Sequence, residues 1–139
     1  FMQDEAQRAA LERRCFFLVE RAGGVYAGTC MAWAQELAGG SVPLLHWLAV
    51  RDGYENRGLA RVLITRVMRR FTAEAPGAPV YLGTQPSSYR AVKLYADFGF
   101  RMLREGDLGP VKNQYAQAME VLRQYLRPEV FRRLEAEAL

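Results

Sequence analysis

The stretch of sequence that decides the fold runs from Leu44 to Phe71 and reads LLHWLAVRDGYENRGLARVLITRVMRRF. Its first seven residues are apolar except for His46 and show no helical period, and they lie between Pro43 and the turn dipeptide Asp52-Gly53. This pattern is typical of a buried strand. A helix is expected to begin near Arg57, because apolar residues then recur at steps of three and four. These residues are Leu59, Val62, Leu63, Val67 and Phe71.

A strand, a glycine-containing turn and a helix N-terminus together predict an anion-binding site. The N–H groups of the first helical turn have no acceptor within the helix, and the helix dipole adds partial positive charge there. Gly58 and Ala60 leave room for a phosphate to approach the backbone.

Composition indicates one soluble globular domain. The chain has 139 residues, of which 50% are hydrophobic and 24% are charged. The formal net charge of +4 is mild and not concentrated, so we expect no nucleic-acid partner and at most an attraction for small anions. No apolar run approaches the roughly 20 residues that span a bilayer, so we expect no membrane partner.

The cysteines, the histidine and the N-terminus narrow the class further. Cys15 and Cys30 lie in apolar strand-like runs, which favours reduced thiols over a disulfide framework. A single histidine and no Cys/His cluster predict no metal site. The N-terminus lacks the apolar core of a signal peptide, so a cytoplasmic location is expected. The chain begins with Phe rather than Met, so we expect either a fragment with a missing beginning or an added first residue.

Helices and strands alternate along the rest of the chain. Helices are expected at residues 3–14, 89–98, 113–126 and 129–138. Strands are expected at residues 15–20, 25–35, 80–84 and 100–104, with turns at 21–24 and 36–43. Gly28 inside the second strand predicts a bulge or a close backbone approach. This order predicts an α/β (α+β) fold with a mixed sheet and helices on its faces, in a single domain over residues 1–139.

The central stretch resembles the acyl-CoA-binding motif of the GNAT superfamily of N-acetyltransferases. In that motif a strand ends in Val and is followed by Gln/Arg-x-x-Gly-x-Gly/Ala at the start of a helix. Here the strand ends in Leu48-Ala49-Val50 and the motif reads Glu55-Asn56-Arg57-Gly58-Leu59-Ala60. Gly58 and Ala60 match, whereas Glu55 stands where the family has Gln or Arg.

A second segment resembles a later helix of the same family, which reads Asn-x-x-Ala-x-x-Leu-Tyr-x-x-x-Gly-Phe. Its residues here run from Ser88, which replaces Asn, to Phe100. The matching residues are Ala91, Leu94, Tyr95, Gly99 and Phe100. The resemblance covers about residues 15–104. The first strand of the family is not visible, and this chain ends in helices where the family has another strand.

The resemblance implies a GNAT-like acyl-CoA N-acyltransferase fold, a central mixed sheet with helices on both faces and, here, a helical C-terminus. It also implies transfer of an acetyl group from acetyl-CoA to a primary amine of a small molecule or peptide, without a metal. The N–H groups of residues 57–61 would hold the pyrophosphate of coenzyme A, and the backbone of Leu48 and Val50 would pair with its pantetheine arm. The expected cofactor-binding residues are Leu48, Ala49, Val50, Asn56, Arg57, Gly58, Leu59, Ala60, Arg61 and Ser88.

Acetyl transfer to an amine needs a neutral nucleophile, a polarised thioester carbonyl and a proton for the leaving thiolate. Within the motif, Tyr95 is the expected proton donor, because a phenol with a pKa of about 10 stays protonated at neutral pH. The alternative is a tyrosine that only packs its ring in a helix interface. The Leu48 N–H is the expected donor to the thioester carbonyl, provided that the strand separates from its neighbour there.

His46 is the only histidine, and in a regular strand its side chain would share a face with Leu44 and Leu48. In the GNAT family a general base, or a residue that orders water toward one, often lies on this strand. An imidazole with a pKa near 6.5 can accept the proton of the amine. A half-buried histidine that is hydrogen-bonded to backbone explains the residue equally well.

The remaining expectations concern Ser88, the C-terminal helices and two rival functions. Ser88 is expected to contact pantetheine or to cap its helix, and capping is favoured. The apolar stripe of residues 113–126 is expected in the core, although it would allow a homodimer if it extended past the sheet.

Two rival functions stay open. One rival is an acyl-CoA-binding or sensory module without turnover. The other is an interaction domain that grips a protein through an exposed apolar patch on residues 113–139.

Overall fold

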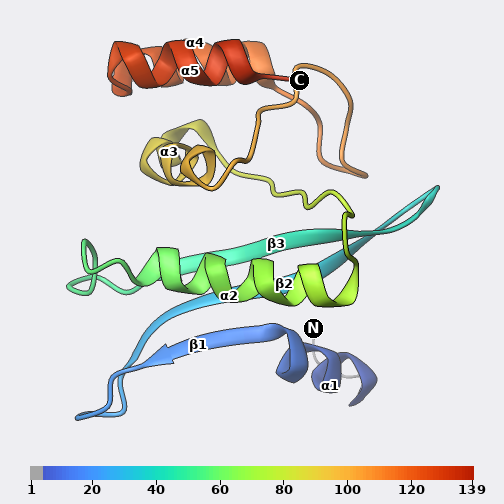
Figure 1. Cartoon of the computed structure of the whole chain (residues 1–139), viewed down its shortest axis with the longest axis vertical. Coiled ribbons are helices and arrows are strands. Elements are labelled where there is room, and N and C mark those ends of the chain that lie inside the picture. The colour runs from blue at the N-terminus through green and yellow to red at the C-terminus, as the bar shows by residue number, and fades with distance from the viewer. Residues whose placement is uncertain (1–4) are drawn as a thin grey trace. The chain divides into compact units, whose positions relative to one another are not determined.

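The structure is a computed structural model that describes residues 5–139 (Figure 1). Two compact units divide the chain, Phe1–Leu82 and Gly83–Leu139. The first unit begins with α1 (Glu5–Arg14), as expected, although residues 3 and 4 of the predicted helix lie outside the described residues. Within the described part of the chain, no helix is both long and apolar enough to cross a bilayer.

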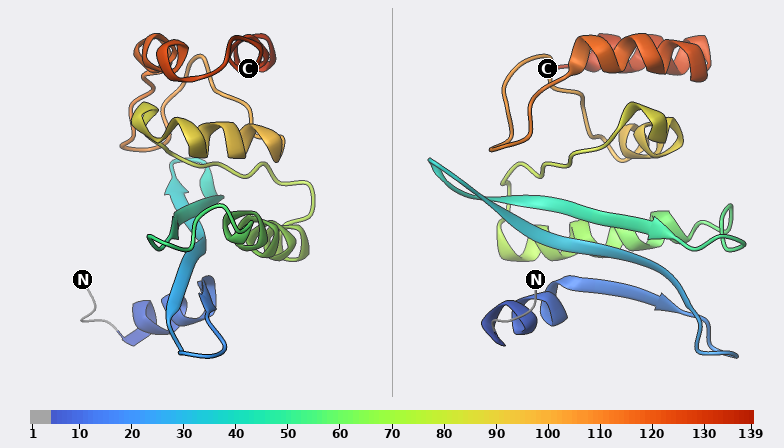
Figure 2. Two further views of the ribbon diagram at one scale, coloured as in Figure 1. Left: turned by 90° about the vertical axis from the view of Figure 1, so that its left-hand side faces the viewer. Right: turned by 180° about the vertical axis from the view of Figure 1, so that it is seen from behind.

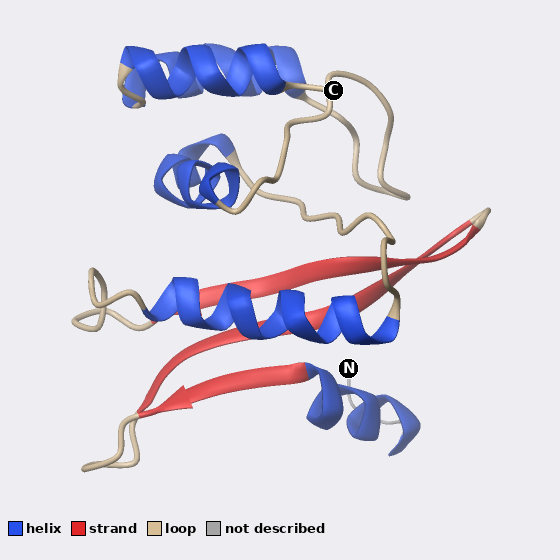
Figure 3. Cartoon of the chain, viewed as in Figure 1, coloured by secondary structure: helices blue, strands red, loops and turns tan. Residues whose placement is uncertain are grey.

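The first unit is built on an antiparallel sheet, drawn in red in Figure 3. Its order is β1 (Cys15–Val19), β2 (Tyr26–Leu37) and β3 (Gly40–Val50). The outer edge of β3 forms one parallel bridge, between Leu44 and Tyr81. The Leu45 N–H donates to the Tyr81 carbonyl at 2.9 Å, and the Tyr81 N–H donates to the Pro43 carbonyl at 2.9 Å. The three-stranded sheet is therefore antiparallel rather than mixed as predicted, and the strand predicted at 80–84 is reduced to this one parallel bridge.

The hairpin between β2 and β3 is tighter than the sequence predicted. β3 begins at Gly40 rather than Leu44, because Gly40 has a φ of 119° that lets the chain reverse directly after Leu37. Pro43, which was expected in a turn, therefore lies in the strand opposite Ala34. It supplies only its carbonyl to the bridge with Tyr81, which is compatible with its missing N–H.

Gly28 confirms the expectation of a close backbone approach. A Cβ added there would lie 3.0 Å from the Ala49 carbonyl oxygen and 3.1 Å from Leu63 Cδ1. The register of β1 and β2 also shifts beside it, since Leu18 opposes Gly28 but Val19 opposes Tyr26. The absence of a side chain at Gly28 thus lets β3 and α2 approach β2 together.

Replacing Gly28 by alanine is expected to lower the free energy of unfolding by about 1–3 kcal/mol, because the added methyl group meets a strand carbonyl that cannot move cheaply. Chemical denaturation followed by circular dichroism measures the change. Gly39→Ala is the matched control, because an added Cβ there meets none of the described atoms within 4 Å. Equal stability of the two variants would show that the approach at Gly28 is not tight.

α2 (Leu59–Glu74) packs its apolar face on this sheet (Figures 1 and 2). It begins two residues later than the sequence predicted. Its buried residues are Leu63, Ile64, Val67 and Phe71. Val62, which was predicted on the apolar face, is instead 55% exposed. Because residues one apart on a helix point about 100° apart, Val62 falls outside the stripe that Leu63 and Val67 define.

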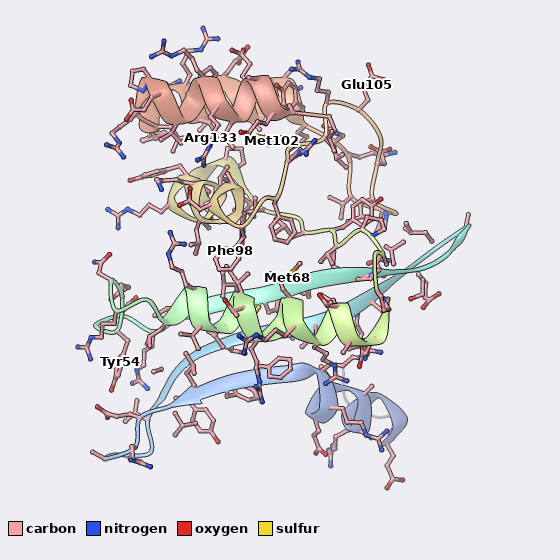
Figure 4. The ribbon with its side chains drawn as sticks, in the orientation of Figure 1. Tyr54, Met68, Phe98, Met102, Glu105 and Arg133 are labelled. Atoms are coloured by element: carbon pink, nitrogen blue, oxygen red, sulfur yellow. The ribbon has the colours of Figure 1, made fainter. Side chains whose placement is uncertain are left out.

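The second unit is helical. It contains η1 (Pro86–Ser88), α3 (Tyr89–Asp97), α4 (Tyr115–Tyr125) and α5 (Pro128–Glu137). α4 and α5 run side by side, and α3 crosses them steeply (Figures 1 and 2). Their buried residues form one core. These are Val92, Ala96, Met119, Leu122, Leu126, Val130, Phe131 and Leu134. Arg133 of α5, labelled in Figure 4, also bonds Asp97 of α3 at 2.9 Å.

The strand predicted at residues 100–104 is wrong, because this segment is not assigned to a strand. It is held instead by the end of the chain. The Leu139 N–H donates to the Met102 carbonyl at 2.9 Å, and the Arg104 N–H donates to the Leu139 carbonyl at 2.7 Å. These two backbone hydrogen bonds give Met102 and Arg104 partners without a neighbouring strand.

Candidate functional site

The end of β3 carries a bulge at the residues that the sequence singled out. Met31 opposes His46 and Thr29 opposes Ala49, so Trp47 and Leu48 together face Cys30. Trp47 has a φ of 49°, a left-handed conformation that is uncommon for a bulky residue. Strained backbone of this kind concentrates at functional sites, so the bulge marks this end of β3 as a candidate site.

The bulge changes which backbone groups face the outer edge of β3. Before it, Pro43 and Leu45 use that edge to bond Tyr81. After it, the Arg51 N–H donates inward to the Ala27 carbonyl at 2.9 Å. Backbone groups alternate along a strand, so Leu48 and Val50 face the outer edge. These are the two residues whose backbone was expected to pair with an extended ligand.

The expectation that His46 and Leu48 share a face of the sheet is wrong. Residues that oppose each other in an antiparallel pair share a face, so His46 lies with Met31 and Ala49 lies with Thr29. Thr29 and Met31 are two apart and share a face, which puts His46 and Ala49 on one side. Leu48 therefore lies on the other. The extra residue in the bulge reverses the alternation that the sequence analysis assumed.

The loop from Arg51 to Gly58 joins β3 to α2 and turns on residues of positive φ. Gly53, Asn56 and Gly58 have φ values of 84°, 59° and 76°. Arg57, between Asn56 and Gly58, is not among the residues of positive φ, and such alternation of φ sign turns successive N–H groups toward one concave side, as in backbone nests that bind anions. Gly58 is the N-cap residue of α2, and the chain supplies no side-chain hydrogen bond to this cap among residues 5–139.

The start of α2 is open as well as uncapped. A Cβ built on Gly58 would meet none of the described atoms within 4 Å. The first intrahelical bond runs from the Val62 N–H to the Gly58 carbonyl at 3.2 Å, so Leu59 and Ala60 precede the helical hydrogen-bond ladder. Both residues are half-buried, and the side chain of Ala60 is a single methyl group. This arrangement fits a diphosphate that approaches backbone N–H groups at a helix N-terminus.

Side-chain contacts that the sequence did not predict brace this loop. The Tyr54 hydroxyl donates to Glu20 Oε2 at 3.2 Å, which ties the loop to the end of β1 (Tyr54 is labelled in Figure 4). Arg57 lies 5.1 Å above the Tyr54 ring and donates to the Gly53 carbonyl at 3.0 Å. Glu55 Oε2 accepts the Gly53 N–H at 2.7 Å. Glu20 and Tyr54 are 34 residues apart, so no local sequence signal pairs them.

His46 sits in β3 directly before the bulge and is half-buried. Its ring stacks on Trp47 with a centroid distance of 5.2 Å and an interplanar angle of 24°. Burial lowers the pKa of His46 below its ordinary value of 6.5. The imidazole is therefore neutral at neutral pH, the form in which a histidine accepts a proton. Its backbone carbonyl accepts the Cys30 thiol at 3.8 Å.

Arg61 lies in the first turn of α2, and the other two predicted site residues, Ser88 and Tyr95, belong to the second unit. Tyr95 lies on α3, is half-buried and meets Phe100 edge to face, with ring centroids 6.0 Å apart. Its carbonyl accepts the N–H groups of Phe98 and Phe100 where the helix ends. Ser88 is the N-cap residue of α3 by position, but its side chain makes no capping hydrogen bond, which overturns the favoured prediction. Tyr89 stacks on Tyr125 at 5.1 Å.

The remaining candidate groups are the two cysteines and any cluster of side chains that could hold a metal ion. Both Cys15 and Cys30 are free thiols, as expected. Cys15 opposes Met31 and Cys30 opposes Phe16, which directs the two thiols to opposite faces of the sheet. Burial raises the pKa of Cys30 to about 11 and keeps it protonated. Across residues 5–139, no three His, Cys, Asp or Glu side chains gather closely enough to hold a metal ion.

Comparison with known proteins identifies the family. Residues 1–100 match the acetyltransferase (GNAT) family, which is more than half of the chain. The chain belongs to the GNAT acetyltransferase family. GNAT enzymes use acyl-CoA co-substrates and act on amine acceptors. A search of curated proteins found no match.

Solved structures confirm the predicted α/β GNAT fold. An acetyltransferase from Trypanosoma brucei matches with a TM-score of 0.55 and 19% identity, over 73% of this chain and 72% of that one. The NatB acetyltransferase complex bound to a bisubstrate inhibitor matches with a TM-score of 0.57 and 19% identity, over 70% of this chain and 59% of that one. An aminoglycoside acetyltransferase from a soil metagenome matches with a TM-score of 0.53 and 24% identity, over 69% of this chain and 66% of that one. This chain therefore spans less than two thirds of the last two, and all three likenesses concern the fold alone.

Proposed function

We propose that this GNAT domain, residues 1–139, transfers an acetyl group from acetyl-CoA to a primary amine of a small molecule or peptide. One observation carries the proposal: a bulged strand that turns the backbone of Leu48 and Val50 outward leads directly into an open, uncapped helix start at Gly58. An extended arm that ends in a diphosphate needs both features in this order, a strand edge and then an anion site.

Most of the cofactor-binding residues would bind coenzyme A through their backbone groups. The N–H groups of residues 57–61 hold the diphosphate, and Asn56 and Gly58 give the loop the conformation that exposes them. Leu48, Ala49 and Val50 offer a strand edge to the pantetheine arm. The Leu48 N–H, turned outward by the bulge, donates to the thioester oxygen and stabilises the charge that develops there. Ser88 contacts the pantetheine, since its hydroxyl is exposed and does not cap α3.

Two side chains move the protons of the reaction. His46 accepts the proton of the amine, directly or through water, because its lowered pKa keeps the imidazole neutral at neutral pH. The neutral amine nitrogen attacks the thioester carbon and gives up this proton to His46 as the C–N bond forms, and the C–S bond then breaks. Tyr95 gives its phenolic proton to the leaving thiolate. The acetyl group ends on nitrogen, and coenzyme A leaves as a thiol.

Release of free thiol from acetyl-CoA in the presence of a panel of primary amines tests the proposal, and the pH dependence tests His46. The ratio of kcat/KM between wild type and His46→Gln is expected to rise from about one at acidic pH to about 10²-fold. The rise should centre below pH 6.5, because the pKa of His46 is lowered and its neutral form is the active one. Titration of the amine is common to both proteins and cancels in the ratio.

Other outcomes of this experiment would point elsewhere. Binding of acetyl-CoA without thiol release by any amine would favour an acyl-CoA-binding module. A ratio that stays constant with pH would remove His46 from the proton path. The panel includes an aminoglycoside and a peptide N-terminus, since one structural neighbour is an aminoglycoside acetyltransferase.

The rival function as a protein-interaction domain loses its main support. It required an exposed apolar patch on residues 113–139. The apolar residues of α4 and α5 are instead buried against α3 within the second unit. We also propose a homodimer formed through these helices. We further propose a cytoplasmic location, and the free thiols of Cys15 and Cys30 agree with a reducing compartment.

A further inference from the structure

Glu55 places a negative charge inside the loop that is proposed to hold a diphosphate. Its carboxylate accepts the Gly53 N–H at 2.7 Å, so it is directed into the loop rather than away from it. Glu55 is exposed, and among the ion pairs of residues 5–139 none includes it. The neighbouring cation, Arg57, is engaged with the Gly53 carbonyl and the Tyr54 ring.

We propose that Glu55 sets the affinity of this chain for coenzyme A through two opposed effects, and this inference rests on the proposed function. Its hydrogen bond to Gly53 orders the loop, which favours binding. Its charge repels the diphosphate, which opposes binding. Glu55 therefore makes binding weaker and more tolerant of salt than a neutral acceptor at the same position would.

The geometry of the loop separates the two effects. Gly53 has a φ of 84°, so its N–H is directed by a left-handed turn that the Glu55 carboxylate stabilises from two residues away. A glutamine can accept the same N–H through its amide oxygen, so Glu55→Gln removes the charge and keeps the bond. Alanine removes both. The difference in affinity for coenzyme A between Glu55→Gln and Glu55→Ala measures the effect of the hydrogen bond. The difference in affinity between Glu55→Gln and wild type measures the effect of the charge.

Calorimetric titration of the whole chain with coenzyme A tests the inference. Glu55→Gln is expected to bind about three- to tenfold more tightly than wild type at low ionic strength, because one repulsive charge near a diphosphate is lost. The ratio of the two affinities should fall toward one at about 1 M salt, where the Debye length falls to about 3 Å. Glu55→Ala is expected to bind about two- to fivefold more weakly than Glu55→Gln, because the loop loses a hydrogen bond.

Glu74→Gln is the matched control. It makes the same change of charge at the last residue of α2, which has 16 residues, so it lies about 24 Å along the helix from the loop. Its carboxylate only forms an exposed pair with Arg70 at 2.8 Å, whose loss costs little stability. Coenzyme A should bind this variant as it binds wild type. The unfolding midpoints of all variants are measured beside the titrations.

The outcomes separate this inference from the proposed function. If wild type binds coenzyme A and Glu55→Gln binds no more tightly, the charge effect is wrong while the cofactor site stands. A gain that persists at high salt, or that Glu74→Gln reproduces, would also overturn it. If Glu55→Ala equals or exceeds Glu55→Gln, the loop-ordering effect is wrong. If neither wild type nor any variant binds coenzyme A, the proposed function itself fails.

Discussion

Replacing Gly58 by glutamate is expected to lower the affinity for acetyl-CoA at least 100-fold, which corresponds to about 2.7 kcal/mol. Gly58 caps α2, and an added Cβ would project into space that is open among the described residues. A longer side chain would then stand before the N–H groups of the first helical turn. Its carboxylate would also repel the diphosphate that these groups are proposed to hold. Calorimetry on both proteins measures the loss.

Gly77→Glu provides the control for backbone strain and charge. Gly77 has a φ of 77° where Gly58 has 76°, and an added Cβ at either position meets no described atom within 4 Å. Both variants therefore carry the same left-handed strain, about 1–3 kcal/mol, and the same new charge. Gly77 follows the C-terminal end of α2 and should leave binding unchanged. Equal losses in the two variants, or none in Gly58→Glu, would move the cofactor site away from this loop.

The strand, turn and helix of the central stretch could be predicted because their signals are local. An apolar run, a turn dipeptide and an apolar period each determine the conformation of neighbouring residues, and all three were confirmed. The boundaries were less predictable, because they depend on single dihedral angles. Gly40 at a φ of 119° allowed a tight hairpin and drew Pro43 into β3, although proline usually indicates a turn.

Features that depend on distant partners could not be predicted in detail. The bulge at Trp47 arises from the register with β2, and it reversed the faces of His46 and Leu48. The link from Tyr54 to Glu20 joins residues with no local relation. The Leu48 N–H was expected to serve only if the strand separated from its neighbour there, and this role stays a prediction.

Short apolar segments late in the chain were the hardest to interpret. Residues 80–84 and 100–104 both carry strand-like composition, yet the first forms a single bridge, between Tyr81 and Leu44, and the second is not assigned to a strand. A strand needs a neighbour along its length, and composition cannot report whether one is present. The amphipathic stripe of α4 was predicted correctly, because its apolar period is long enough to specify both a helix and its buried face.

Replacing Tyr95 by phenylalanine is expected to lower kcat for acetyl transfer by about 10² or more, with little change in the affinity for acetyl-CoA. The change removes one hydroxyl and keeps the ring, so the edge-to-face contact with Phe100 survives. Without a donor, the thiolate must leave unprotonated or take a proton from water. Steady-state kinetics with an amine that the panel has identified, together with calorimetry, separates the loss of turnover from any loss of binding.

Tyr125→Phe is the control for the loss of a tyrosine hydroxyl in the same unit. Tyr125 is exposed and stacks on Tyr89 through its ring, so phenylalanine preserves its packing and kcat should not change. If Tyr95→Phe turns over like wild type, Tyr95 only packs in its helix interface and the thiolate finds its proton elsewhere. If the variant loses acetyl-CoA binding instead, Tyr95 serves the cofactor site rather than the chemistry. A selective loss of kcat is the one outcome that neither packing nor cofactor binding explains, because both would also change stability or affinity.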